Sequence, residues 1–278
     1  MKGVYWLASY PKSGNTWVRA FLASYLFRMG QGVDINALPF GPLISQREFI
    51  DDWLGMESAD MPDEEVDRYR PEIHSRLVES DLEYPIYKTH ERYRLTCDGR
   101  AIFPKEGTRG VVLVVRDPRD IAHSLANHLQ TSIEGAIEVM NTSSFVLDGR
   151  SDSVFGKFPE ETGSWTEHAN SWLSAPLRRH IIRYEDMILD PIEAFSSLLD
   201  FLECPLQPSV LKGAIENTQF EMLKRQEASK GFNGKNPNVR NFFKSGEAGV
   251  WNTQLTPSQV ARLVLKNRKN LSHFGYCF

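Results

Sequence analysis

Short apolar runs alternate with amphipathic stretches along the chain. Three runs resemble buried parallel strands, because each is followed by a polar or proline-marked turn and then by a helical pattern. They are Val4 to Ala8, Val111 to Val115 and His180 to Arg183, with Pro85 to Lys88 as a weaker fourth. Helical spacing predicts helices over Thr16 to Arg28, Pro118 to Gln130, Ser164 to Leu173, Pro191 to Leu202 and Pro257 to Leu271.

This alternation predicts an α/β fold, a mostly parallel sheet flanked by helices on both faces. We find no repeat and no Gly/Ser linker long enough to divide the chain, so a single domain over residues 1–278 is expected. The segment from Asp34 to Arg76 is expected to be a helical insertion that either shapes a pocket or only packs. Thr142 to Phe158 and Glu227 to Gly249 are expected to be mobile loops, because loops this long commonly bind ligands or act as lids.

Composition narrows the class of protein. The 278 residues are 41% hydrophobic, which is ample for a core, and the net charge of -4 argues against general nucleic-acid binding. The three cysteines, Cys97, Cys204 and Cys277, are too far apart for a zinc knuckle or a redox pair. With no leader-like or membrane-spanning apolar segment, we expect a cytoplasmic protein with no membrane span. The oligomeric state stays open, a homodimer included.

The strongest chemical signal is the octet Tyr10-Pro11-Lys12-Ser13-Gly14-Asn15-Thr16-Trp17 between the first strand and the first helix. A helix N-terminus offers unpaired N–H groups and a partial positive charge, which suits a phosphate. Gly14 allows a close backbone approach, Ser13 and Thr16 add hydroxyls, and Lys12 adds a full charge. The octet is not a Walker A loop, because the lysine precedes the glycine. The alternative is a polar turn that only caps the helix.

A second candidate anion site follows the strand Val111 to Val115. Arg116 stands at the carboxyl end of that strand, where open α/β sheets bind ligands, and Ser124 lies eight residues later in the next helix. A guanidinium and a hydroxyl can clamp a phosphate. The run from Arg116 to Asp120 fits a salt-bridged turn equally well.

Histidine supplies the candidate base. His90, in Tyr87-Lys88-Thr89-His90, follows the weaker strand and has a side chain whose unperturbed pKa of about 6.5 suits proton transfer at neutral pH. His168 is the second candidate. His74, His128, His180 and His273 are interpreted as structural, which is the commoner role of a lone histidine.

Together these motifs resemble the PAPS-dependent sulfotransferases, the soluble cytosolic type and its bacterial relatives. The resemblance rests on the octet, on Lys88-Thr89-His90, on the Arg116 to Ser124 spacing, on Gly163-Ser164-Trp165 with His168 and Trp172, and on Tyr184-Glu185-Asp186. The order and spacing run from Val4 to about Trp251. Five matches in one order are more specific than any one of them.

The resemblance implies a role for each matching residue. Lys12, Ser13, Gly14, Thr16 and Trp17 match the 5'-phosphosulfate loop, which also includes Asn15 as a binding residue, with Trp17 also near the adenine. Arg116 and Ser124 match the 3'-phosphate site, and Tyr184, Thr218 and Phe220 match the adenine pocket. His90 matches the catalytic base and Lys88 the lysine beside it, while Lys12 also serves catalysis.

Two positions depart from the family pattern. Asn15 stands where the cytosolic enzymes usually have threonine, although its amide can still donate to an anion. The last motif reads Phe243-Lys244-Ser245-Gly246 before Gly249-Val250-Trp251, so the usual arginine is replaced by Lys244 or is missing. Lysine offers a point charge instead of a bidentate fork. Lys235 or Arg240 from the same loop is a candidate to complete the clamp.

The resemblance thus implies transfer of a sulfuryl group from PAPS (3'-phosphoadenylyl sulfate) to a hydroxyl or amine of a small-molecule acceptor, leaving adenosine 3',5'-bisphosphate. No metal is expected. The rival hypotheses are a nucleotide or small-molecule kinase and a non-catalytic PAPS-binding protein. The acceptor itself is not identifiable, although aromatic residues of the two variable segments suggest an apolar ring or are plain core: Phe40, Phe49, Trp53, Phe145, Phe155 and Phe158.

Overall fold

The four predicted strands form one sheet, ordered β2-β1-β3-β6. Its strands are β1 (Val4–Ser9), β2 (Ile86–Thr89), β3 (Thr108–Val115) and β6 (Arg179–Arg183). β1 pairs in parallel with β2, with Tyr5 opposite Ile86. Every residue of β1 and the last six of β3 are buried, which explains why both strands are continuous apolar runs. The predicted α/β class with a parallel sheet is confirmed.

The five predicted helices are also confirmed, with nearly the predicted bounds. They are α1 (Asn15–Arg28), α4 (Pro118–Leu129), α6 (Trp165–Ser174), α8 (Pro191–Phe201) and α12 (Pro257–His273). Proline in the first turn starts α4, α8 and α12. Ser164 caps α6 through a capping box with Glu167, and Thr256 does the same for α12 with Gln259.

The remaining elements were not predicted one by one. Residues 34–76 contain α2 (Arg47–Leu54) and α3 (Asp63–Arg76), and η1 (Leu77–Glu79) follows them. The others are α5 (Ile133–Met140), β4 (Val146–Leu147), β5 (Glu160–Glu161), α7 (Tyr184–Leu189), α9 (Pro208–Asn217), α10 (Phe220–Lys230) and α11 (Trp251–Gln254). β4 and β5 form a separate antiparallel pair.

The computed structural model describes residues 3–41, 43–58, 60–79, 81–147, 156–235 and 238–277. Residues 148–155, Phe155 among them, and residues 236–237 lie outside the described ranges. They belong to the two loops that the sequence predicts to be mobile, so that prediction stays untested. In the described ranges, no helix combines the length and the apolar character that a membrane crossing requires.

The chain divides into two compact units. Unit 1 consists of Met1–Tyr10, Phe40–Leu113 and Thr142–Ile181. Its core gathers aromatic rings around Trp6, whose ring centroid lies 5.1 Å from that of Phe103 and 5.3 Å from that of His74. Within this unit α2 packs on α3.

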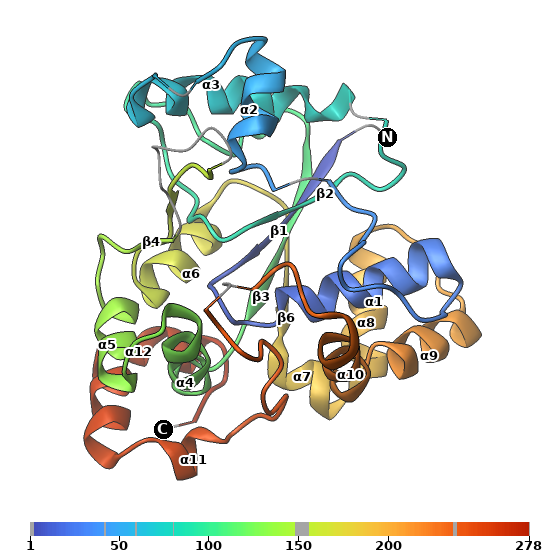
Figure 1. The fold of residues 1–278 in the computed structure, drawn as a ribbon, viewed down its shortest axis with the longest axis vertical. Helices are drawn as coiled ribbons and strands as arrows, with labels where there is room; N and C mark the ends of the chain where they lie inside the picture. Colours follow the sequence, from blue (N-terminus) through green and yellow to red (C-terminus); the bar gives the residue numbers. More distant parts are fainter. Residues whose placement is uncertain are drawn as a thin grey trace. The chain divides into compact units, whose positions relative to one another are not determined.

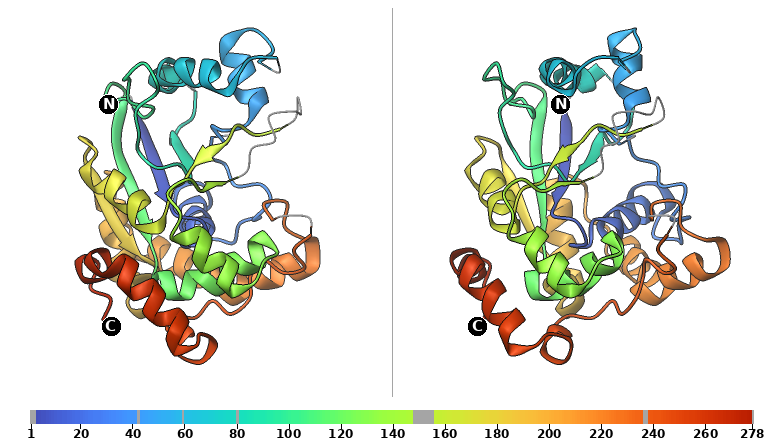
Figure 2. Two further views of the ribbon diagram at one scale, coloured as in Figure 1. Left: turned by 90° about the vertical axis from the view of Figure 1, so that its left-hand side faces the viewer. Right: turned by 60° about the vertical axis from the view of Figure 1, so that its left-hand side comes forward.

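Unit 2 consists of Pro11–Pro39, Val114–Asn141 and Ile182–Phe278. The helices α1, α8 and α9 lie side by side in it (Figure 1), and the rings of Phe21 and Phe195 stack at 3.8 Å between α1 and α8. α4 packs on α5 and α12 as a second group of helices (Figure 2). The sequence motifs therefore divide: most of the predicted nucleotide-binding residues belong to unit 2, and the candidate base belongs to unit 1.

Candidate functional site

The loop between β1 and α1 has an unusual backbone. Lys12 has a φ of 71°, in the left-handed region that residues other than glycine rarely adopt. Gly14 has a φ of 106° and immediately precedes α1. A Cβ atom on Gly14 would lie 2.7 Å from Cδ2 of Tyr184, so only glycine fits there. The loop thus brings the positive end of the α1 dipole up to Tyr184.

Several side-chain polar atoms of the octet are buried with no hydrogen-bond partner within the described residues, the Ser13 hydroxyl and Nε1 of Trp17 among them. Ser13 is fully buried. Such groups are rare in folded proteins, because an unsatisfied buried donor costs free energy. Both residues belong to the octet that the sequence assigns to an anion. The observation fits a nucleotide ligand that supplies the missing acceptors.

Lys12 is held by aromatic and backbone contacts. Its Nζ lies 3.3 Å from the ring centroid of Phe242. Its carbonyl oxygen accepts a hydrogen bond from Nη1 of Arg116 at 3.4 Å. Lys12 and Arg116, the leading residues of the two predicted anion sites, are therefore neighbours. Asn15 is buried and Thr16 half-buried in the first turn of α1.

Arg116 is buried at the end of β3 with 8% of its surface exposed. Its Nη2 donates to the carbonyl oxygen of Glu247 at 2.9 Å, and its Cζ lies 4.0 Å from the ring centroid of Tyr184. Its Nε has no partner within the described part of the chain. The guanidinium thus retains a donor for a ligand while it joins the octet, Tyr184 and the 227–249 loop.

The residues after Arg116 build the turn itself. Asp117 accepts the N–H of Arg119 at 2.9 Å as the cap of α4, and its Oδ2 pairs with Nη2 of Arg119 at 2.6 Å. Cζ of Arg119 lies 4.0 Å from a ring centroid of Trp251. Asp120 accepts the N–H of Trp251 at 2.9 Å. The salt-bridged-turn interpretation therefore holds for these residues, whereas Arg116 points to the candidate site.

The C-terminal residues brace the same turn. Arg119 donates from Nη2 to the carbonyl oxygen of Cys277 at 2.8 Å. The hydroxyl of Tyr276 donates to Oε2 of Glu185 at 2.8 Å, and Oε1 of Glu185 accepts the N–H of Asp117 at 2.9 Å. Burial raises the pKa of Glu185, and the Asp117 N–H opposes that rise.

Tyr184 lies at the centre of the candidate nucleotide site. Its hydroxyl donates to the carbonyl oxygen of Gly246 at 3.0 Å, and its ring meets Trp17 edge to face at 5.6 Å. Burial raises the pKa of Tyr184, and the charge of Arg116 opposes the rise. Gly246 has a φ of 70°, and a Cβ atom there would lie 2.2 Å from Cγ of Phe220. Tyr184, Trp17, Phe220 and Gly246 therefore form one contact group.

Thr218 and Phe220 lie at the junction of α9 and α10. The fully buried Thr218 donates its hydroxyl to the carbonyl oxygen of Ala214 at 2.7 Å, so this donor is used within α9. The half-buried Phe220 meets Phe243 edge to face at 5.8 Å, and Trp17 packs against the same apolar cluster. Of the predicted pair, Phe220 is the partly exposed residue.

The remaining predicted phosphate residues are less tightly connected. Ser124 is half-buried on α4, and no described contact joins it to Arg116. Lys244 and Ser245 are exposed. Burial lowers the pKa of His123, the residue before Ser124, and the charge of Lys244 lowers it further. Lys244 therefore lies near α4.

Lys235 and Arg240, the candidates to complete the clamp, have contacts within their own loop. Nζ of Lys235 donates to the carbonyl oxygen of Arg240 at 2.7 Å and lies 3.5 Å from Oε1 of Glu227. The carboxylate of Glu227 also accepts the N–H groups of Phe242 and Phe243 at 2.7 and 2.8 Å. Glu227 therefore shapes the segment that contacts Lys12, a role with no signal in the sequence.

His90 immediately follows β2 in unit 1. Its Nδ1 lies 2.7 Å from the carbonyl oxygen of Ser9 and 3.2 Å from the Ser9 hydroxyl. Because a carbonyl oxygen only accepts, this contact assigns the proton of the neutral ring to Nδ1 and the lone pair to Nε2. A histidine in this tautomer can accept a proton at Nε2. Ser9 was not singled out from the sequence.

His168 differs from His90 in burial. Only 1% of its surface is exposed, and burial lowers its pKa to about 3, opposed by a hydrogen bond with the His90 backbone. Its ring lies edge to face with Tyr10 at 5.8 Å. A buried, neutral imidazole that supports the His90 backbone is better explained as a structural residue than as the second candidate base.

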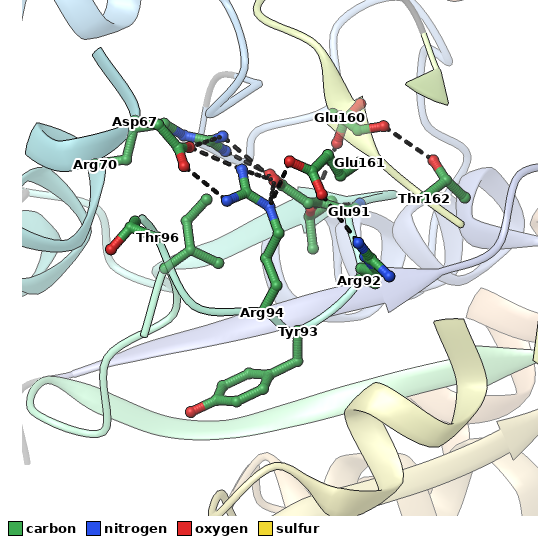
Figure 3. A network of polar contacts seen from close by, with 12 residues as sticks. Asp67, Arg70, Glu91, Arg92, Tyr93, Arg94, Thr96, Glu160, Glu161 and Thr162 are labelled. Atoms are coloured by element: carbon green, nitrogen blue, oxygen red, sulfur yellow. Dashed lines mark hydrogen bonds and ion pairs between the residues drawn. The ribbon is translucent and has the colours of Figure 1, made fainter. Parts of the chain in front are cut away.

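A buried carboxylate meets the segment that carries the candidate base. Oε1 of Glu160, on β5, accepts the N–H of His90 at 2.8 Å and the hydroxyl of Thr89 at 3.3 Å. Lys88 acts on Glu160 through its charge. Figure 3 shows Glu160 beside Glu161 and Glu91. No sequence signal pointed to Glu160.

The aromatic residues proposed to shape an acceptor pocket are partly core. Phe49 is buried and meets Trp53 edge to face at 6.4 Å, and Phe158 is buried beneath the guanidinium of Arg47. Phe145 lies 6.4 Å from Tyr10, ring centroid to ring centroid. Phe40 is half-buried. Within the described residues, no group of three or more His, Cys, Asp or Glu side chains could hold a metal ion.

Comparisons with known proteins identify the family. The family model of the sulfotransferase domain matches residues 3–275, through both units. Cytosolic sulfotransferase 17 of Arabidopsis thaliana is 26% identical over 274 residues, which cover 93% of this chain and 71% of that protein. Flavonol 3-sulfotransferase of Flaveria bidentis is 24% identical over 281 residues, covering 92% and 78%.

Solved structures agree on the fold. A mouse sulfotransferase complexed with PAP has a TM-score of 0.60 at 18% identity, covering 96% of this chain and 85% of that one. Retinol dehydratase in complex with androsterone and PAP has a TM-score of 0.60 at 19% identity, covering 96% and 80%. The chain belongs to the sulfotransferase domain family. It is an enzyme, a sulfotransferase.

Proposed function

We propose that this enzyme transfers the sulfuryl group of PAPS to a hydroxyl or amine of a small-molecule acceptor. The observation that carries the proposal lies in unit 2, where Arg116 contacts both Lys12 and Tyr184. The unsatisfied donors of Ser13 and Trp17 in the same loop support a nucleotide ligand. The matching relatives are named sulfotransferases, and two structural neighbours contain PAP.

Unit 2 would bind the nucleotide. Lys12, Ser13, Gly14, Asn15 and Thr16 would hold the 5'-phosphosulfate end at the N-terminus of α1. The 3'-phosphate would be held by Arg116 and Ser124, together with Lys244, Ser245 and Gly246. Trp17, Tyr184, Thr218 and Phe220 would enclose the adenine. PAPS supplies an activated sulfuryl group, whose transfer breaks the bond to the bridging oxygen and leaves adenosine 3',5'-bisphosphate.

Unit 1 would supply the base. Nε2 of His90 would take the proton of the acceptor hydroxyl as its oxygen attacks sulfur, while the Ser9 carbonyl holds the Nδ1 proton. Lys12 and Lys88 would stabilise negative charge that develops on the sulfuryl and bridging oxygens. A preorganised donor of this kind contributes about 3 to 4 kcal/mol to the transition state. Ser9 lies three residues before Lys12 in the sequence, at the end of β1.

Replacing His90 tests the base, and nucleotide binding tests the cofactor. His90→Ala should lower kcat roughly 100- to 10,000-fold, with an unchanged Kd for adenosine 3',5'-bisphosphate. Thermal stabilisation by adenosine 3',5'-bisphosphate in magnesium-free buffer supports the sulfotransferase. Stabilisation by Mg-ATP alone would indicate a kinase instead, and nucleotide binding without sulfuryl transfer would indicate a binding protein.

The same proposal covers the acceptor, the cellular location and the partners of the protein. A panel of phenols, sterols, sugars and glycopeptides with radiolabelled PAPS would identify the acceptor class. The relatives named cytosolic sulfotransferases support a cytoplasmic location. We expect no nucleic-acid partner, because the formal charge is -4. Cell fractionation tests the location. Size-exclusion chromatography with and without nucleic acid tests the absence of a nucleic-acid partner, and it also reports the oligomeric state.

A further inference from the structure

Glu160 is a buried carboxylate far from His90 in the sequence. It lies on β5, opposite Leu147 of β4, with 6% of its surface exposed. Removing a carboxylate from water is costly unless its oxygens receive hydrogen bonds or face positive charge. The partners that Glu160 has therefore indicate what it does.

Those partners belong to the Lys88-Thr89-His90 segment. Oε1 accepts the His90 N–H at 2.8 Å and the Thr89 hydroxyl at 3.3 Å. The Thr89 hydroxyl in turn accepts the N–H of Glu91 at 3.0 Å. Burial raises the pKa of Glu160, and the Lys88 charge and the His90 N–H oppose the rise. One carboxylate thus holds the peptide of the candidate base and faces the neighbouring lysine.

The segment after His90 is secured by other contacts. Glu91, with none of its surface exposed, pairs with Arg70 at 2.6 Å and with Arg94 at 2.7 Å in the network of Figure 3. Arg94 also pairs with Asp67 at 2.7 Å, and the carbonyl oxygen of Glu91 accepts from Nε1 of Trp172 at 3.0 Å. Because this network anchors the chain from Glu91 onward, the contacts of Glu160 act on the residues before it.

We propose that Glu160 is a positioning residue that fixes the backbone and orientation of His90, an inference that rests on the proposed role of His90 as base. His90 is thereby held at three points: Ser9 holds its ring, and Glu160 and His168 hold its backbone. An imidazole fixed in this way keeps Nε2 in one direction. Misplacement of a reacting group by about 1 Å can cost roughly 100-fold in rate.

Two variants separate the hydrogen bond from the charge. Glu160→Ala removes both and should lower kcat roughly 10- to 100-fold, with the KM for PAPS unchanged. Glu160→Gln retains an oxygen that can accept the His90 N–H, so kcat should stay within about threefold of the parent. The acid limb of its kcat/KM profile should move to lower pH, because an imidazolium would lose a nearby negative charge. The other charges facing Glu160 are Lys88, Glu91 and Arg70, which stay in place.

Glu161→Gln is the matched control. Glu161 is the neighbour on β5, but 43% of its side chain is exposed, and it pairs with Arg92 at 3.1 Å and with Arg94 at 3.6 Å. This variant should retain the parent kcat and pH profile. The unfolding midpoint of each variant reports on folding, and Glu160→Gln keeps the test decisive if Glu160→Ala does not fold.

An NMR measurement that does not depend on turnover tests the positioning role of Glu160 separately from the role of His90 as base. The imidazole NMR signals of ¹⁵N-labelled protein, assigned with His90→Ala, should shift in Glu160→Ala and stay unchanged in Glu161→Gln. Parent-like signals and parent-like kcat in both Glu160 variants would overturn the positioning role. Full activity of His90→Ala, with shifted signals in Glu160→Ala, would overturn the base and leave the positioning role intact.

Discussion

The guanidinium carbon of Arg116 lies 4.0 Å from the ring centroid of Tyr184, while Nη2 of the same group donates to Glu247. The planar cation thus lies over an aromatic ring while one of its nitrogens forms a hydrogen bond. A lysine offers a point charge in place of this flat fork and cannot make both contacts.

Arg116→Lys should therefore weaken nucleotide binding. Hydrogen bonds to a charged group contribute about 1.5 to 3 kcal/mol, so the Kd of adenosine 3',5'-bisphosphate should rise roughly 10- to 100-fold. Isothermal titration calorimetry measures the change. Lys212→Gln, which removes an exposed cation of the same unit, is the control and should leave the Kd unchanged. An unaltered Kd in Arg116→Lys would remove Arg116 from the proposed site.

Gly14→Ala should damage the loop before α1. The new Cβ would lie 2.7 Å from Cδ2 of Tyr184 at a φ of 106°, so both the backbone and the ring must shift. We expect the free energy of unfolding to fall by about 1 to 3 kcal/mol and the stabilisation by adenosine 3',5'-bisphosphate to be lost. Differential scanning calorimetry with and without the nucleotide measures both.

Gly55→Ala provides the comparison for that variant. Gly55 has a φ of 68°, and no described atom lies within 4 Å of the position that a Cβ would take, so the variant carries the backbone strain without the clash. It should cost about 1 kcal/mol and leave nucleotide stabilisation intact. Equal loss of stabilisation in both variants would contradict a local role for Gly14.

Lys244→Arg should strengthen the proposed 3'-phosphate site. The change restores the fork that the resemblance leads one to expect and keeps the charge. The Kd of adenosine 3',5'-bisphosphate should fall about three- to tenfold, whereas that of adenosine 5'-monophosphate, which has no 3'-phosphate, should not change. Lys212→Arg, at an exposed position on α9, is the control. If Lys244→Arg leaves both constants unchanged, Lys244 does not contact the phosphate.

Two buried histidines should make folding sensitive to acid. Burial lowers the pKa of His74 and of His168 from 6.5 to about 3. As pH falls below about 6.5, the unfolded chain takes up these protons first, so stability decreases until the folded pKa is reached. Each histidine contributes up to about 1.4 kcal/mol per pH unit in that window.

His168→Gln should reduce this acid sensitivity. Between pH 7 and pH 4, the free energy of unfolding measured with urea should fall as the pH falls. The slope should be smaller in the variant than in the parent by about 1.4 kcal/mol per pH unit. His273→Gln alters an exposed histidine of α12 and should follow the parent curve. A parent-like slope in His168→Gln would show that His168 is not the buried neutral group described above.

Local sequence signals predicted the elements that position the site. The apolar runs of β1 and β3 and the prolines that start α4, α8 and α12 are readable without tertiary information. The short α7 follows β6 without a side-chain cap, and α10 is only weakly amphipathic, so neither has a clear local signal.

The candidate site itself was only partly predictable. Arg116, Tyr184 and Lys12 were identified by motif, and the structure brings them together. Glu160 could not be found in this way, because its partner His90 is 70 residues distant and a single glutamate forms no motif. The burial of His168, which lowers its pKa, has no signal in the sequence.

The bracing of the Arg116 turn by Tyr276 and Cys277 matters for handling the protein. These two residues are hydrogen-bonded to Glu185 and Arg119, and both of those contact Asp117, the residue next to Arg116. Removal of Tyr276 and Cys277 would therefore take away both hydrogen bonds and loosen the turn that carries Arg116. Assays of this enzyme are best made with these two residues retained.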